Sequence, residues 1–351
     1  MKLLIITQKV DKNDSILGFF HRWIEEFAKN CEKITVICLY KGECSLPENV
    51  KVLSLGKEKG VSRLKYLFNF YKYIIKHRKE YNSVFVHMNQ IYVILGGLLW
   101  KMMNKKIALW YTHKNVSTSL KLAEKITDIV FTASKNSFRL SSKKVKVMGH
   151  GIDVSKFCPA DKTEKNNSVF NIITVGRISP VKKYEELIET VDRIISANLI
   201  NKKIKVKIIG GAVDSEGEKY FSRLKKLVEE KKLEDVIFFT GALDSGGVIG
   251  CLQDSDLFVH MSQTGSLDKV VLEAMACGVL VLSNNESVVS DVFKNNNLFC
   301  YKNIDELLAN IKKIVNLEKE KLDDFRMKNR QVVSLNHNLS SLINKILLNL
   351  K

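Results

Sequence analysis

A single carboxylate stands in an otherwise apolar stretch in the second half of the chain. The neighbours of Glu273 are all apolar: Val270, Val271, Leu272, Ala274, Met275 and Ala276. This pattern predicts a short buried helix, which Gly278 would end. A buried carboxylate is costly unless it is paired or hydrogen-bonded, so Glu273 needs a partner. Two interpretations stay open: nearby backbone, which would make Glu273 structural, or the hydroxyl groups of a bound sugar.

The loop before this helix combines small residues with charged ones. Gly265 and Ser266 leave room for a ligand at the helix N-terminus, where backbone N–H groups and the helix dipole favour anions. Asp268 and Lys269 follow directly, with one charge of each sign. The stretch therefore predicts a ligand-binding loop.

Two cations follow another apolar segment. Phe170 to Val175 is predicted as a strand and Tyr184 to Ala197 as a helix, and Arg177 and Lys182 lie on the loop between them. An arginine offers a planar fork to two phosphate oxygens, a lysine offers a mobile point charge, and the following helix adds its dipole. Phosphate binding is one interpretation, and ordinary surface side chains are the other.

A histidine follows a predicted strand in the first half. His113 comes just after Ile107 to Tyr111, beside Lys114. Open α/β sheets bind ligands at the carboxyl ends of their strands. A surface histidine in a solvated loop is the alternative.

One pattern has the letters of a metal site. Asp254-Ser255-Asp256 lies between a predicted helix and a predicted buried strand, where aspartates serve turns and helix caps. We therefore expect no metal there.

The charge and the cysteines narrow the protein class. The net charge of +18 attracts polyanions: nucleic acid, an anionic membrane surface or phosphorylated small molecules. No nucleic-acid-binding motif is visible, so we expect no nucleic-acid partner. The seven cysteines are odd in number and form no Cys-x-x-Cys pair, which indicates reduced thiols rather than disulfides or zinc.

No apolar run reaches the roughly 18 to 20 residues that span a bilayer. The longest, Ile91 to Trp100, is followed by Lys101, and the opening MKLLIIT is too short for a signal peptide. We expect a cytoplasmic protein, with peripheral attachment to the inner face of the membrane as an open alternative.

Strand and helix patterns alternate along the chain, which predicts α/β architecture with parallel sheets and right-handed crossovers. Polar residues 158–168, which include one of only three prolines, predict a linker. The predicted strands are 3–6, 34–39, 83–87, 107–111, 129–133, 145–148, 170–175, 204–209, 236–240, 257–261 and 279–282. The predicted helices are 18–30, 61–81, 91–103, 120–127, 136–140, 184–197, 220–232, 249–253, 270–276, 304–317, 320–333 and 336–350.

The predicted helix 61–81 has an apolar side and a strongly basic side. Its apolar side contains Leu64, Leu67, Phe68, Tyr71, Ile74 and Ile75. Its basic side contains Arg63, Lys65, Lys72, Lys76, His77, Arg78 and Lys79. One interpretation is a helix packed on the sheet with a solvated basic face. The other is a helix that lies on an anionic membrane surface.

Three stretches together resemble a known family. VVLEAMACG with the strand after it (270–282), ITVGRISPVKKYEELIET (173–190) and GHGIDVSKFCP (149–159) resemble the retaining glycosyltransferases of family four, in the family's order and spacing. The resemblance implies the GT-B fold, an α/β architecture of two Rossmann-like domains that face each other across a cleft. We expect an acceptor domain at 1–160, which the returning helix 336–351 completes, and a donor domain at 165–335.

The resemblance also implies an activity. Such an enzyme moves a sugar from a UDP- or GDP-linked donor to a glycan or lipid-linked acceptor, in cell-surface polysaccharide or glycolipid synthesis. The family needs no metal and no other cofactor, because the nucleotide sugar is a co-substrate. Its motifs imply that Gly176, Arg177 and Lys182 meet the diphosphate and that Glu273 meets the ribose. They also imply that His113 contacts the donor sugar or the reaction centre. In the family the first strand-to-helix loop is Gly-rich and lies near the diphosphate. This sequence has only Gly18 there, and a plain helix-start glycine is the alternative.

The sequence also departs from the family before Glu273. Gly265 stands eight positions before Glu273, where the family usually has a second glutamate. Either Asp268 substitutes for that carboxylate, or the backbone of Gly265, Ser266, Leu267, Asp268 and Lys269 holds the sugar. Asp268 as a nucleophile also stays open, as does Lys269 as a partner of phosphate or of an acidic donor.

Two rival functions remain at this level. A nucleotide-sugar epimerase on the same fold would release an isomerised sugar without an acceptor. A non-catalytic polyanion-binding protein would fit the charge and the missing glutamate.

Overall fold

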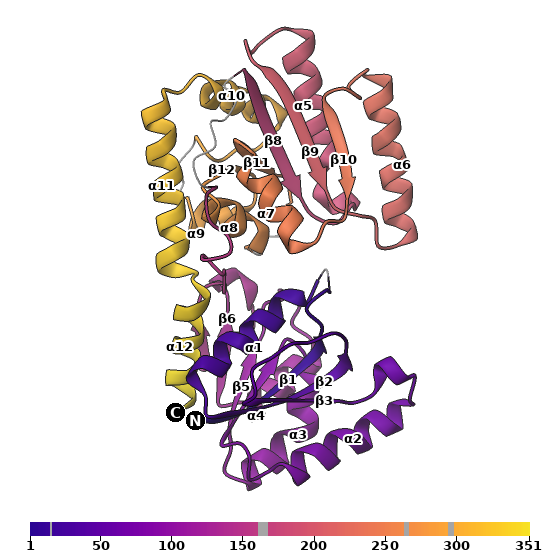
Figure 1. Cartoon of the computed structure of the whole chain (residues 1–351), viewed down its shortest axis with the longest axis vertical. Helices are drawn as coiled ribbons and strands as arrows, with labels where there is room; N and C mark the ends of the chain where they lie inside the picture. Colours follow the sequence, from indigo (N-terminus) through magenta and orange to yellow (C-terminus); the bar gives the residue numbers. More distant parts are fainter. Residues whose placement is uncertain (15, 161–167, 263–266, 294–297) are drawn as a thin grey trace. The chain divides into compact units, whose positions relative to one another are not determined.

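The computed structural model describes residues 1–14, 16–160, 168–262, 267–293 and 298–351. These residues form two compact units (Figure 1). The first unit contains Met1–Gly151 and Leu339–Lys351, and the second contains Ile152–Asn338. The sequence places the same division slightly later, at 160–165, and starts the returning helix at 336. Most of the predicted linker 158–168 lies outside the described residues.

The first unit is built on a parallel sheet in the order β3-β2-β1-β4-β5-β6-β7. Its strands are β1 Lys2–Val10, β2 Lys33–Lys41, β3 Val50–Ser54, β4 Ser83–His87, β5 Lys106–Trp110, β6 Ile129–Thr132 and β7 Val145–Val147. The sequence analysis missed β3, a short edge strand with no fully buried residue. An edge strand packs on fewer neighbours, so its apolar pattern is weak.

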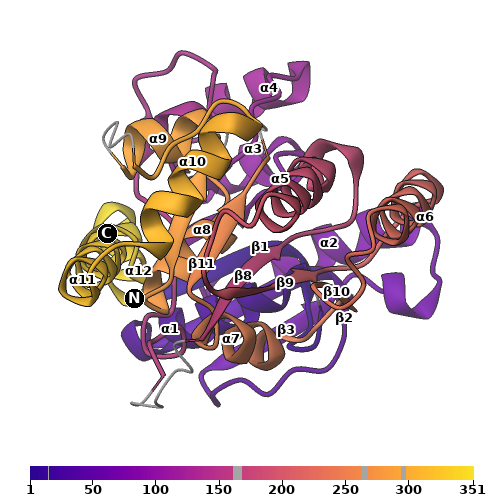
Figure 2. The same ribbon diagram turned by 90° about the horizontal axis from the view of Figure 1, so that it is seen from above.

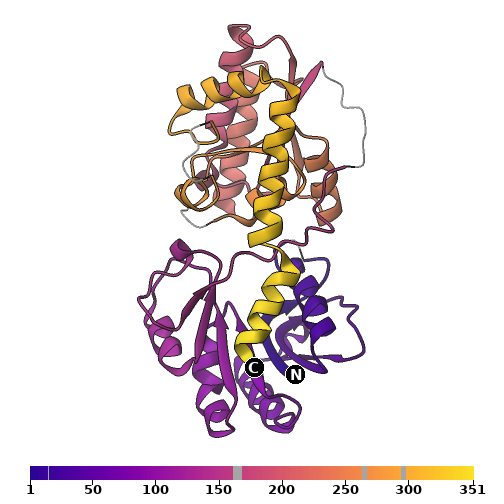
Figure 3. The same cartoon turned by 90° about the vertical axis from the view of Figure 1, so that its left-hand side faces the viewer.

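Helices cover both faces of this sheet. They are α1 Gly18–Asn30, α2 Arg63–Lys76, α3 Ile91–Met102, α4 Thr118–Ile126 and α12 Leu339–Leu350. Alternate residues of β1 face opposite sides. Leu3 and Ile5 pack in one core with α1 and α12, whereas Leu4 and Ile6 pack in the other with α2, α3 and α4. Figure 3 shows α12 beside α1, with the two chain ends close together.

The second unit repeats this plan with a smaller parallel sheet in the order β10-β9-β8-β11-β12. Its strands are β8 Val169–Val175, β9 Lys203–Ile209, β10 Ile237–Gly241, β11 Leu257–His260 and β12 Leu280–Ser283. Its helices are α5 Tyr184–Ser196, α6 Ser215–Glu230, α7 Ser245–Gln253, α8 Lys269–Ala276, α9 Glu286–Asp291, α10 Ile304–Val315 and α11 Lys319–Asn336. Helices α5 and α6 lie on one side of β8, β9 and β10, and α7 lies on the other (Figure 2).

Short 3-10 turns complete the elements, at Lys57–Lys59, Lys135–Ser137 and Pro180–Lys182. The predicted helix 136–140 is therefore wrong: the structure has the single turn Lys135–Ser137 there. A segment this short gains too few hydrogen bonds to offset the cost of starting a helix.

Helix 61–81 packs on the sheet through Phe70 and Ile74, but its predicted length and most of its predicted buried stripe are wrong. The helix is shorter, Arg63–Lys76, and its buried residues are Phe70 and Ile74. Leu64, Phe68 and Ile75, which the pattern places on the packed side, are exposed. His77, placed on the basic side, is buried and its Nδ1 lies 2.8 Å from Glu80 Oε1. The helix turns a different stripe to the sheet because the aromatic Phe70 fills the space beside Trp100 and Tyr92.

Within the described ranges, no helix is both long enough and apolar enough to cross a bilayer.

Candidate functional site

The carboxyl ends of β8 and β11 bring the main polar groups of the second unit together. These two strands are hydrogen-bonded neighbours in the sheet. β8 ends at Val175 and leads into Gly176-Arg177, while β11 ends at His260. Asp268 is the residue just before α8. The sheet order therefore places Lys182, His260 and Asp268 side by side, although they are far apart in sequence.

The backbone under this site is tightly packed. Gly210 has a φ of +145°, and a Cβ added to it would lie 1.9 Å from the carbonyl oxygen of Gly176. Only glycine fits at such a position. The hydroxyl of Tyr184 donates to the same Gly176 oxygen at 3.0 Å. The loop that carries Arg177 is thus held by contacts from two other segments. The sequence analysis missed Gly210, although Gly210-Gly211 directly follows a buried strand and signals such an approach.

Asp268 accepts from two side chains. The Nζ of Lys182 donates to Asp268 Oδ2 at 2.9 Å, and His260 Nε2 lies 2.9 Å from the same oxygen. Burial alone would raise the pKa of Asp268, but the hydrogen bond from His260 and the charge of Lys182 outweigh it and hold the pKa well below its ordinary value. Asp268 is therefore a carboxylate at any ordinary pH.

His260 is the site residue that sequence analysis missed. It is buried, stacks on Phe258, and its Nδ1 lies 3.0 Å from the hydroxyl of Ser283. Burial lowers its pKa, against the opposing effect of Asp268, so the imidazole is neutral near pH 7. The sequence contained a signal for His260, because a histidine ends the apolar strand Leu257–His260. His113 was selected because it follows a predicted strand in the same way.

Arg177 and Lys182 differ in their surroundings. Arg177 is exposed and has no ion-pair partner within the part of the chain that the structure describes. Lys182 is half-buried and ends the 3-10 turn before α5. One cation is therefore free to meet a ligand, and the other is already oriented by a carboxylate.

Glu273 finds its partner on its own helix. Lys269 Nζ lies 3.4 Å from Glu273 Oε1, one helical turn away. The partner is thus a side chain, which neither sequence interpretation named. Leu267 is buried. Gly265 and Ser266 lie outside the described residues, so the prediction for them stays a prediction.

His113 and Gly18 belong to the first unit. His113 is exposed just after β5, with its ring 5.9 Å from that of Tyr111. Gly18 begins α1, and its N–H donates to the carbonyl of Asp14 at 2.9 Å. Their roles toward a donor stay predictions.

Comparison with known proteins identifies the second unit. Residues 160–332 match the family of glycosyl transferases group 1, a segment that holds Lys182, His260, Asp268 and Glu273. This part of the chain belongs to the glycosyl transferases group 1. The resemblance stated from the three motifs is confirmed at this level.

Two curated relatives each match part of this chain. The D-inositol 3-phosphate glycosyltransferase 2 of Catenulispora acidiphila is 27% identical over 147 residues, which cover 40% of this chain and 34% of that protein. The putative colanic acid biosynthesis glycosyltransferase WcaL of Escherichia coli is 26% identical over 156 residues, which cover 43% and 36%. The matched segments therefore span only about a third of each relative.

The fold extends the likeness to the whole chain. Anabaena Alr3699/HepE, solved in complex with UDP, has a TM-score of 0.77 at 17% identity and covers 100% of this chain and 99% of its own. Together with the two parallel-sheet units, this confirms the predicted α/β fold class, GT-B.

Asp256 holds neighbouring segments of the second unit, and the expectation that 254–256 binds no metal stays a prediction. Asp256 Oδ2 accepts from the N–H of Asn171 at 2.9 Å, and Asp256 Oδ1 lies 3.5 Å from Arg326. Asp254 is the C-cap residue of α7. Across the described ranges, no three His, Cys, Asp or Glu side chains are grouped as they would be around a metal ion.

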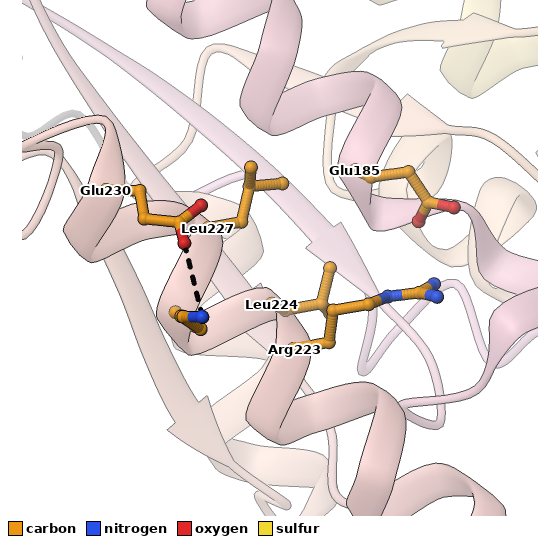
Figure 4. Close-up of a pocket in the computed structure, with 6 residues that line it drawn as sticks. Glu185, Arg223, Leu224, Leu227 and Glu230 are labelled. Carbon is orange, nitrogen blue, oxygen red and sulfur yellow. Dashed lines mark ion pairs between the residues drawn. The ribbon is translucent and has the colours of Figure 1, made fainter.

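A hollow of about 500 Å³ lies between α5 and α6 (Figure 4). Its lining is Glu185, Arg223, Leu224, Lys226, Leu227 and Glu230. Lys226 and Glu230 pair across one turn of α6 at 3.5 Å. None of the predicted site residues lines this hollow, so it is separate from the site at the strand ends.

Proposed function

We propose that this chain is a retaining glycosyltransferase of family four that transfers a sugar from a UDP- or GDP-linked donor to a glycan or lipid-linked acceptor. One observation carries the proposal. Arg177 and Lys182 lie together on the loop between β8 and α5, at the carboxyl edge of a parallel sheet, with Lys182 already fixed by Asp268. That edge is where open α/β sheets bind nucleotides.

The two cations suit the leaving group. When the donor's C1–O bond to the diphosphate breaks, negative charge develops on the departing phosphate oxygen, and fixed cations stabilise it. In the proposed reaction the acceptor oxygen bonds to C1 on the same face. The acceptor proton passes to the departing phosphate oxygen, and bond formation on that same face gives retention. No metal is proposed for this step.

Other groups complete the proposed donor site. Glu273 would accept the ribose hydroxyls while Lys269 holds one of its oxygens. His113 and the Gly18 loop of the first unit are proposed to face the donor. HepE was solved with UDP and with UDP-glucose, which supports a uridine donor, and the likeness to WcaL supports a role in cell-surface polysaccharide synthesis.

Ligand-induced thermal stabilisation tests this proposal. The chain would be heated with UDP, GDP, ADP and their common sugar conjugates. A ligand at 100 times its dissociation constant should stabilise the fold by about 2.7 kcal/mol. Arg177→Ala should remove most of this gain. Arg193→Ala, on the exposed face of α5 and paired with Glu189, is the matched control and should keep it.

Two further measurements, retention on heparin and isomerisation of the donor, separate the rival functions. Absence of a shift with every nucleotide, together with salt-sensitive retention on heparin, would favour a polyanion-binding protein. A donor that binds and is isomerised without an acceptor would favour an epimerase. Both outcomes contradict the transferase.

We also propose that the first unit works at an anionic membrane surface, through α2 and α3. Leu64 of α2 and Met102 of α3 are 79% and 83% exposed, and Phe68 and Leu98 are exposed beside them on the same two helices. Lys65 lies over the Phe68 ring. Exposed apolar side chains between basic ones suit the boundary between headgroups and acyl chains, where each basic residue contributes roughly 1 kcal/mol. The predicted cytoplasmic location stays a prediction.

Vesicle sedimentation tests the membrane proposal. The protein should sediment with vesicles that contain phosphatidylglycerol but not with pure phosphatidylcholine. The double variant Leu64→Ser with Phe68→Ser should lose most of this binding. Phe238→Ser, which removes an exposed aromatic from β10 of the second unit, is the control. Equal binding by the double variant and the control would contradict the proposal.

A further inference from the structure

A chain of hydrogen bonds links the core of the second unit to Lys182, which with Arg177 is a candidate phosphate-binding residue. It runs from Asn285 through Ser283, His260 and Asp268 to Lys182. We propose that His260 and Asp268 form a positioning relay that holds the Lys182 ammonium in place for a departing diphosphate. The inference deepens the function proposed above and depends on it.

The direction of the relay follows from Asp268. An ionised carboxylate can only accept, so His260 Nε2 donates to it at 2.9 Å and the neutral ring accepts at Nδ1 from the Ser283 hydroxyl at 3.0 Å. The backbone N–H of Asn285 donates to the Ser283 oxygen at 3.1 Å, which fits a hydroxyl hydrogen that points to His260. The structure thus assigns one tautomer to His260.

The position of His260 has no packing explanation. It ends a strand whose other residues, Leu257, Phe258 and Val259, are apolar and fully buried. Burying an imidazole is costly unless both ring nitrogens are hydrogen-bonded. Phe258 of the same strand stacks on the ring, and the Tyr301 hydroxyl donates to the backbone carbonyl of His260 at 3.1 Å, which fixes the strand end. A rigid donor aimed at a carboxylate explains a histidine there.

The relay acts on Lys182 through charge and direction. An ammonium group has three hydrogens, and Asp268 takes one of them. The lysine stem, otherwise mobile, is fixed, and two hydrogens remain for ligand oxygens. The carboxylate also adds a negative charge beside the proposed anion site. Asp268 therefore orients the Lys182 ammonium and does not increase the affinity of the site for phosphate. In this proposal Asp268 is a positioning residue and not a sugar ligand.

This balance predicts a separation between binding and turnover. Asp268→Asn removes the negative charge but leaves Lys182 without its ionic anchor. UDP affinity should be unchanged or higher, while the kcat of UDP-glucose hydrolysis or transfer should fall about 10- to 100-fold. Lys182→Ala should weaken UDP binding about tenfold, because it removes a charged hydrogen bond. GDP and GDP-mannose would be run in parallel.

The second unit offers a matched control. Lys231 and Asp192 form an ion pair at 2.6 Å with side chains 22% and 23% exposed, against 18% and 21% for Lys182 and Asp268. This pair joins α6 to α5 and is not at the strand ends. Asp192→Asn should leave both UDP affinity and kcat unchanged. If Asp268→Asn behaves like Asp192→Asn, or loses UDP affinity as Lys182→Ala does, the relay is wrong.

Two substitutions separate positioning from folding. His260→Gln retains an N–H donor that can reach Asp268 and should keep much of the kcat, whereas His260→Leu should not. Circular dichroism verifies that both variants fold. Equal kcat values for the two would mean that the hydrogen bond to Asp268 does not matter.

A measurement without ligand tests the His260–Asp268 relay separately from the proposed glycosyltransferase function. Nitrogen-15 NMR of the histidine rings, assigned with His260→Gln, should show a neutral His260 protonated at Nε2. Asp268→Asn should perturb that signal. If wild-type protein binds neither UDP nor GDP, the proposed function fails even where this tautomer is found. An Nδ1-protonated His260 overturns the relay even where nucleotides bind.

Discussion

Two histidines end strands in the two units and meet very different surroundings. His87 ends β4 and His260 ends β11, and both are buried with Nδ1 near a hydroxyl, Thr7 at 3.3 Å and Ser283 at 3.0 Å. His87 stacks on Phe20 at 3.9 Å, within an aromatic group, whereas His260 reaches Asp268 and through it Lys182. The strand end provides burial and one hydroxyl partner. The residues that arrive from other segments decide whether the ring packs or joins a charged site.

The comparison predicts that side-chain packing stabilises the first unit where β4 ends at His87, beside Phe20. Phe20 is fully buried, so Phe20→Ala should destabilise the first unit by about 3–5 kcal/mol through lost burial and a cavity. All three tryptophans, Trp23, Trp100 and Trp110, lie in the first unit. Their fluorescence in urea should therefore report the loss, and a shift below 1 kcal/mol would contradict the packing interpretation.

The second unit should depend on hydrogen bonds at the matching edge. Asp268→Ala leaves the His260 N–H and the Lys182 ammonium without their shared acceptor, which should cost about 1–3 kcal/mol. The loss should appear in the circular dichroism transition but not in the tryptophan transition. An equal change in both signals would show that the effect is not local to the second unit.

The pH dependence sharpens the contrast. The folded pKa of His260 lies below its ordinary value because the ring is buried, although Asp268 opposes that effect and Lys182 supports it. The unfolded chain therefore takes up a proton first as the pH falls, and this histidine's contribution to stability is full above about pH 6.5 and declines below it. His260→Gln should flatten the decline between about pH 7 and 5 in the circular dichroism transition.

The first unit provides a reference for that measurement. Burial also lowers the pKa of His21, so the tryptophan transition should decline in the same direction. His260→Gln should leave that decline unchanged. A flattened tryptophan transition in this variant would refute the assignment to His260.

The smallest effect should come from the ion pair on α8. Lys269 and Glu273 form a partly exposed pair one turn apart, and such pairs contribute about 0.5 kcal/mol. Lys269→Met should therefore change the stability of the second unit very little. Glu273 is proposed to meet the ribose, so the variant should change UDP affinity more than it changes the urea midpoint. The reverse order would make the pair purely structural.

Local sequence patterns predicted several elements of the second unit and the residues they carry. The motif at 173–190 placed Arg177 and Lys182 on the loop between a strand and a helix, as the structure has them. The motif at 270–278 predicted the short helix α8 with Glu273 inside it. Patterns failed where burial depends on distant neighbours. The stripe of α2 that packs is set by Trp100 and Tyr92, and no spacing within 61–81 reveals them.

The sequence by itself determined the alternation of strands and helices, the two units and the cations of the candidate site, because each depends on residues close together in the chain. Only the tertiary structure decided which of those cations is oriented. Lys182 and Asp268 are 86 positions apart, and they meet because β8 and β11 are neighbours in the sheet. His260 acquires its role the same way, since Ser283 arrives from β12 on its other side. Sheet order is a property of the folded chain, and it brings Lys182, Asp268, His260 and Ser283 into one hydrogen-bonded group.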